Sequence, residues 1–208
     1  MNHSRALAPY HNMIMDLVKD GWNATADQRA EHTGTATRTH LTCPANYLRV
    51  IVEMNGDAPV HCRLGITPGG TGEPARWRAS ATAPPAAYWL AAARAAHHAV
   101  INTHRVNLFP GDVLTRLGWS QLGAQIDATT LRTIYSHPHD TSRVSYQPSQ
   151  RAMPALWTIT RPSTRIGVLV NAAEPRALPS LILTLALTTT THHAPASTTE
   201  QPRPRPQK

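Results

Sequence analysis

Three potential metal ligands lie within four residues at His137-Pro138-His139-Asp140, which is the densest such cluster in the chain. Protein zinc sites take their ligands from two segments at regular spacing, and no paired His or Cys motif with that spacing is present. His97, His98 and His104 follow an Ala-rich helical segment, where the helix dipole favours histidine near the carboxyl end. We therefore predict a turn at 137–140, with neither a metal nor a cofactor.

The two cysteines, Cys43 and Cys62, are candidates for a catalytic nucleophile. A catalytic cysteine needs a nearby base and an electropositive, partly exposed setting, and the sequence indicates neither. Small buried residues on or beside strands are the favoured interpretation. The glycine-rich segment 69–72 lacks the Lys-Ser/Thr of a phosphate loop, and no nucleophile-elbow motif is present. The sequence thus predicts no catalytic residue and no enzyme.

Positive charge is spread along the whole chain. The 208 residues carry 20 Lys+Arg and 12 Asp+Glu, a formal net charge of +8, and only Lys19 and Lys208 are lysines. Residues 1–108 hold +3, residues 109–188 hold +3 and residues 189–208 hold +2. Because no block concentrates this charge, a solvated surface is favoured over an electrostatic footprint for nucleic acid.

An internal repeat organises the sequence. Gly21-Trp22 recurs as Gly118-Trp119, each at the end of an apolar-periodic stretch where glycine can close a helix. Cys43-Pro44 before Arg49-Val50 matches His137-Pro138 before Arg143-Val144, at an offset of 94, and Trp77 matches Ile166, at an offset of 89. Strands are predicted in the first copy at 39–42, 48–54, 60–66 and 76–82, and in the second at 131–136, 142–147, 155–160 and 165–171.

These elements predict an α+β fold of two tandem modules, each a helix, a four-stranded antiparallel sheet and a helix. The closing helices are expected at 84–100 and 174–187. The first module spans residues 1–104 and the second 105–188, joined near 100–109. A disordered Thr/Pro/Arg tail is expected at 189–208, because this segment lacks apolar content. The copies could pack as an intramolecular pseudo-dimer that buries edge strands.

Short motifs in both copies carry a resemblance to a known repeat. The first copy has Cys43-Pro44-Ala45-Asn46-Tyr47 and then Trp77-Arg78-Ala79-Ser80; the second has Ser136-His137-Pro138-His139-Asp140 and then Leu156-Trp157. The pattern resembles the actinobacterial SPDY repeat domain of unknown function. That domain is named after the tetrapeptide Ser-Pro-Asp-Tyr, which is intact in neither copy. The structural signature would be Gly21, Trp22, Trp77, Gly118, Trp119 and Trp157. The resemblance implies an actinobacterial plasmid or other mobile-element context and no known activity.

Two function classes follow. The first is a non-catalytic binding or scaffolding protein with an unidentified protein partner, an accessory factor of a mobile element by resemblance. The alternative is a nucleic-acid-binding protein that uses Arg-bearing strands, with the candidate residues Arg49, Arg63, Arg76, Arg78 and Tyr47. A helix-turn-helix over 112–134 is disfavoured, because the repeat predicts a strand at 129–136. No apolar run reaches the ~18 residues of a membrane span, and the first residues lack a signal-peptide pattern, so a cytoplasmic protein is expected.

Overall fold

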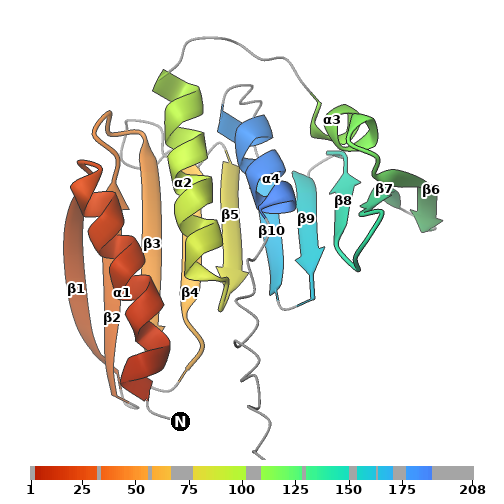
Figure 1. Ribbon diagram of the computed structural model, residues 1–208. Helices are drawn as coiled ribbons and strands as arrows, with labels where there is room; N and C mark the ends of the chain where they lie inside the picture. Colours follow the sequence, from red (N-terminus) through yellow and green to blue (C-terminus); the bar gives the residue numbers. More distant parts are fainter. Residues whose placement is uncertain are drawn as a thin grey trace, which may run out of the picture.

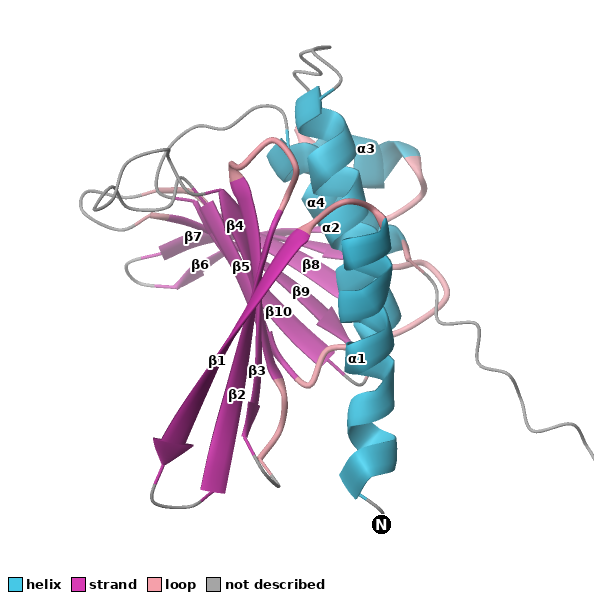
Figure 2. Ribbon diagram, turned by 90° about the vertical axis from the view of Figure 1, so that its left-hand side faces the viewer, coloured by secondary structure: helices cyan, strands magenta, loops and turns pink. Residues whose placement is uncertain are grey.

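Ten antiparallel strands form one continuous sheet in the part of the chain that the computed structural model describes. These residues are 3–31, 34–55, 58–66, 77–101, 109–127, 130–149, 154–162, 164–170 and 177–188. Within them, four helices lie on one face of the sheet, and the opposite face has no helix (Figures 1 and 2). We call the opposite face the helix-free face.

The order of elements is the same in the two halves of the chain. The first half consists of α1 (His3–Lys19), β1 (Asn23–Glu31), β2 (Gly34–Thr42), β3 (Leu48–Asn55), β4 (His61–Ile66), β5 (Trp77–Thr82) and α2 (Ala86–Ile101). The second consists of α3 (Pro110–Arg116), β6 (Ser120–Asp127), β7 (Thr130–Ser136), β8 (Arg143–Gln147), β9 (Ala155–Arg161), β10 (Thr164–Val170) and α4 (Ala177–Leu187).

The two halves share one sheet, so the prediction of two separate four-stranded modules is wrong. The strand order is β1-β2-β3-β4-β5-β10-β9-β8-β7-β6, and β5 pairs antiparallel with β10 at the centre. Without this pairing, the last strand of each half would expose unpaired backbone groups along one edge. The helices α2 and α4 pack against each other over the same junction (Figure 1).

The sequence prediction also missed one strand in each half, β1 and β6. Both are the outermost strands of the sheet. The described side chains of β1, from Asn23 to Asp27, are all exposed, so this part of the strand has no buried face to produce an apolar alternation. β6 follows α3 directly, at the place where a helix-turn-helix would require its second helix.

The core lies between the helices and the helix-facing side of the sheet. Alternate strand residues are buried there, as in β5, where Trp77, Ala79 and Ala81 are buried and the residues between them are exposed. The buried helix residues Leu17, Trp89 and Leu181 belong to the same apolar cluster. Because successive side chains of a strand point to opposite faces of the sheet, every second side chain of these strands lies on the helix-free face.

Both Gly-Trp segments close a helix in the same way. Gly21 has a φ of 86° and Gly118 a φ of 85°, in the left-handed region. The N–H of Trp22 donates to the carbonyl of Leu17 at 3.0 Å, and the N–H of Trp119 donates to that of Leu114 at 3.0 Å. These are the hydrogen bonds of a Schellman motif, which explains the glycine at each helix end.

Some sequence predictions fall outside the described residues. These are the tail at 189–208, the glycine-rich segment 69–72, the junction at 102–108, His104 and Arg76. Among the residues that are described, no helix combines the length and apolarity needed to cross a membrane.

Candidate functional site

The helix-free face carries most of the described positive charge. Arginines project to this face from seven strands: Arg38, Arg49, Arg63, Arg78, Arg132, Arg143 and Arg165. All seven are exposed, and each alternates with residues that face the helices. Among the side chains that the structure describes on this face, the acidic ones are Asp27 and Glu53. The face therefore has a clear excess of positive charge.

The strand register places these arginines in rows across the sheet. Gly65 pairs with Arg49 on one side and with Arg78 on the other, so the two arginines flank a residue without a side chain. A Cβ at Gly65 would lie 2.8 Å from the backbone oxygen of Trp77, so this position has no room for one. Arg143 and Arg165 both pair with Thr160 of β9, one on each side.

One carboxylate neutralises part of this face. Glu53 of β3 lies between β2 and β4, with its Oε1 2.7 Å from Arg38 Nη2 and its Oε2 3.4 Å from Arg63 Nη2. Its side chain is only 12% exposed, whereas the two arginine side chains are 48% and 44% exposed. Glu53 therefore holds the inner side of both guanidinium groups while their outer sides stay in solvent.

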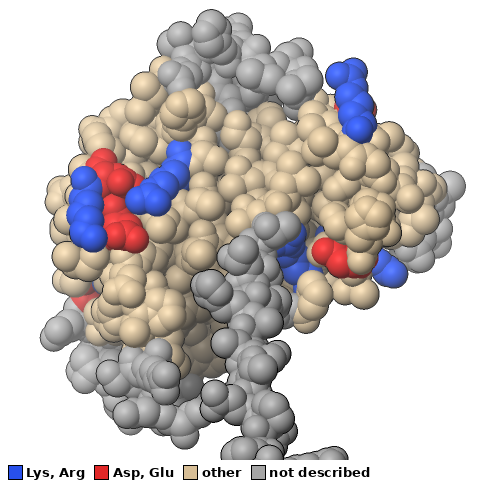
Figure 3. All heavy atoms as spheres, in the orientation of Figure 1, with Lys and Arg blue, Asp and Glu red and all other residues tan. Residues whose placement is uncertain are grey.

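The rest of the described structure is balanced in charge. Among the side chains that the structure describes outside that face, four are basic and four are acidic: Lys19, Arg94, Arg116 and Arg161, with Asp16, Asp20, Asp112 and Asp140. Figure 3 shows the helix side, where charged side chains are few and basic groups adjoin acidic ones. Arg161 is used internally, since it donates to the carbonyls of Ala186 and Thr188 at the end of α4.

None of the aromatic side chains lies on the helix-free face. All five Trp, five Tyr and the single Phe are among the described residues, and the strand-borne ones occupy helix-facing positions. Trp157, for example, packs against Tyr146, with 4.4 Å between ring centroids and a tilt of 33°, and lies 5.4 Å from the Phe109 ring centroid. The helix-free face thus lacks the aromatic platform on which single-stranded bases stack.

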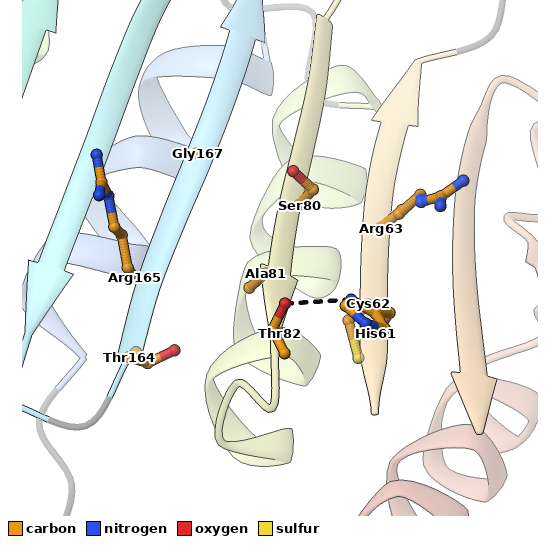
Figure 4. Close-up of a pocket in the computed structure, with 9 residues that line it drawn as sticks. All are labelled: His61, Cys62, Arg63, Ser80, Ala81, Thr82, Thr164, Arg165 and Gly167. Carbon is orange, nitrogen blue, oxygen red and sulfur yellow. Dashed lines mark hydrogen bonds between the residues drawn. The ribbon is translucent and has the colours of Figure 1, made fainter. Parts of the chain in front are cut away.

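A hollow of about 590 Å³ lies at the centre of the helix-free face, where β4, β5 and β10 meet. Its lining consists of His61, Cys62, Arg63, Ser80, Ala81, Thr82, Thr164, Arg165 and Gly167. Figure 4 views it with the helices behind the sheet; Ser80 and Gly167 lie between Arg63 and Arg165. The Thr82 hydroxyl and His61 Nδ1 are 3.1 Å apart, which fixes the imidazole beside the hollow.

The five residues of the sequence-based nucleic-acid hypothesis do not form one set. Arg49, Arg63 and Arg78 share the helix-free face, and Arg76 lies outside the described residues. Tyr47 lies on the helix side, with its ring stacked 6.4 Å from that of His97. The sequence hypothesis missed Arg38, Arg132, Arg143 and Arg165. Arg143 and Arg165 stand directly before Val144 and Ile166 in strands that were predicted, and this alternation was the signal that could have found them.

The signature residues of the repeat are structural. Trp22 and Trp119 are each 3% exposed, and each makes an edge contact with a histidine ring, that of His97 and that of His137 respectively. Trp77 and Trp157 are also buried in the apolar core.

The remaining chemistry candidates have packing or turn roles. Cys43 and Cys62 are buried free thiols, and burial raises the pKa of Cys62 to about 12, which excludes a thiolate at neutral pH. His137 Nδ1 accepts a hydrogen bond from the His139 N–H at 3.2 Å, within the turn between β7 and β8. Among the described residues, no group of three His, Cys, Asp or Glu side chains could hold a metal ion.

Comparison with known proteins adds no relative. No protein-family model matches the chain, and no curated protein or solved structure matches it significantly. The resemblance to the SPDY repeat domain therefore stays a prediction.

Proposed function

We propose that the chain is a non-catalytic nucleic-acid-binding protein whose helix-free face contacts the phosphate backbone. The observation that carries this proposal is the partition of charge between the two sides of the sheet. Of the charged side chains that the structure describes, seven arginines and two acids occupy the helix-free face, and four basic and four acidic residues lie elsewhere. Arginine suits this task, because its planar guanidinium donates two hydrogen bonds to one phosphate.

The arrangement of the face favours backbone contact over recognition of bases. The arginines extend from β2 to β7 across seven strand intervals, which corresponds to about 34 Å at the usual strand spacing, or about ten base pairs of duplex. Because the face has no aromatic side chain, stacking on bases contributes nothing to binding there. The expected ligand is therefore duplex DNA, bound with little dependence on its sequence.

Fluorescence anisotropy with a labelled duplex tests the proposal. The double variant Arg49→Gln/Arg78→Gln removes two charges from the helix-free face, and the matched control Lys19→Gln/Arg116→Gln removes two from the helix side. We expect the first variant to weaken binding by about 100-fold at low salt and the control to change it less than about threefold. Wild-type affinity should fall by several powers of ten between about 50 and 200 mM salt. Absence of binding at the lower salt, or equal loss in both variants, contradicts the proposal.

The scaffolding function and the plasmid context expected from the resemblance stay predictions. A scaffold for an acidic protein would use the same face, because its charge excess attracts any polyanion. Such a scaffold would keep its acidic partner at a salt concentration at which duplex binding is lost. A pull-down compared between wild type and Arg49→Gln/Arg78→Gln would then identify partners that depend on this face.

A further inference from the structure

The hollow at the β5–β10 junction has the composition of an anion site. The polar residues that line it are Arg63, Arg165 and His61, with the hydroxyl-bearing Ser80, Thr82 and Thr164. No carboxylate lines it. An environment of donors and positive charges without an acid favours a ligand with several anionic oxygens.

The hollow exists because its floor has little side-chain volume. Ser80 of β5 pairs with Gly167 of β10, so two small residues meet at the centre of the sheet. A Cβ built at Gly167 would meet no atom within 4 Å, which shows that the space above this residue is open. The neighbouring positions carry arginines whose side chains leave in opposite directions, Arg63 toward β3 and Arg165 toward β9 (Figure 4).

Size and charge together indicate a phosphodiester rather than a single small ion. A volume of about 590 Å³ is within the range of sites for nucleotide-sized ligands. A backbone lying over Ser80 and Gly167 would have one arginine on each side. Both side chains are exposed, so Arg165 can turn toward it at the cost of rotamer freedom, and Arg63 can do so when it leaves its ion pair with Glu53.

We propose that this hollow is the central phosphate subsite of the helix-free face and seats one strand of the nucleic-acid backbone. The inference rests on the proposed function. The first half of the chain supplies Arg63, Ser80 and Thr82, and the second half supplies Arg165 and Gly167. The subsite therefore exists only because β5 and β10 pair.

A charge placed in the hollow gives the sharpest test. Gly167→Glu introduces a carboxylate where there is open space. Gly123→Glu is the matched control, because a Cβ at Gly123 would also meet nothing within 4 Å. Gly123 lies on the outermost strand β6, away from the hollow. We expect Gly167→Glu and Arg165→Gln each to weaken duplex binding about tenfold or more, and Gly123→Glu to change it less than about threefold. Circular dichroism melting confirms that each variant is folded.

A titration with inorganic phosphate separates the subsite from the proposed function. In the wild-type NMR spectrum, the amide signals of Ser80 and Gly167 should shift with phosphate, and those of Gly123 should not. If the hollow variants bind duplex like wild type while Arg49→Gln/Arg78→Gln binds weakly, the subsite is overturned and the proposed function stands. If wild type does not bind duplex, the proposed function fails, and the subsite is then overturned unless phosphate shifts Ser80 and Gly167.

Discussion

Ala79 of β5 lies directly opposite Val168 of β10, and the two residues are separated by the same 89 positions that relate Trp77 to Ile166 in the sequence repeat. This pair therefore marks the point about which the two halves are related. Both residues are fully buried against the helices. The central strand pairing and the apolar core meet at this position, so the two halves should unfold together.

Val168→Ala tests this cooperativity. Removing two buried methyl groups at the junction should lower the free energy of unfolding by about 2 kcal/mol through lost apolar contact and a residual cavity. In urea denaturation, we expect one transition that moves as a whole, seen identically by tryptophan fluorescence and by far-ultraviolet circular dichroism. Two separate transitions, with only one shifted by the substitution, would show that the halves are independent.

Gly118→Ala tests the helix end at α3. Gly118 has a φ of 85°, and a Cβ there would meet nothing within 4 Å, so the backbone conformation alone determines the cost. We expect a loss of about 1 kcal/mol in unfolding free energy. Gly123→Ala is the matched control, because Gly123 also has open space but no positive φ. The prediction fails if the two variants have equal stability in thermal or urea unfolding.

His97 should make stability depend on pH. Burial lowers the pKa of His97 below 6.5, while Asp20 partly opposes this shift and His98 adds to it. The Trp22 and Tyr47 rings both contact its imidazole. The unfolded chain takes up a proton near pH 6.5 and the folded chain only at lower pH. Stability should therefore fall as pH is lowered from about 6.5 toward the folded pKa, and this contribution should level off below it.

The measurement is Tm between about pH 5 and pH 7. His97→Phe should flatten this dependence, because the ring stays apolar and cannot take up a proton. His11→Gln is the control, since His11 is exposed on α1. An unchanged slope in His97→Phe would assign the pH dependence to other groups.

The interior strands could be predicted from the sequence, but the arginine-bearing helix-free face that they form could not. The segment 48–54 alternates apolar and polar residues, and it forms β3, because burial on one side imposes that alternation. Residues 23–27 of β1 are exposed and have no such constraint. Charge counted along the chain also appeared diffuse, since Arg49 and Arg165 are far apart in sequence. Only strand register and the β5–β10 pairing bring such residues to one face, and neither is encoded in local composition.

Glu53→Gln should strengthen nucleic-acid binding. The Glu53 carboxylate oxygens lie 2.7 Å from Arg38 Nη2 and 3.4 Å from Arg63 Nη2. Without the negative charge of Glu53, both guanidinium groups are free to bind phosphate. We expect affinity for the labelled duplex to rise about fivefold to tenfold at low salt, and the salt dependence to steepen by about one phosphate contact. Asp16→Asn is the matched control, because Asp16 pairs with Lys19 on the helix side at 3.1 Å and its loss changes net charge equally. Equal gains in both variants would mean that net charge, and not this face, governs binding.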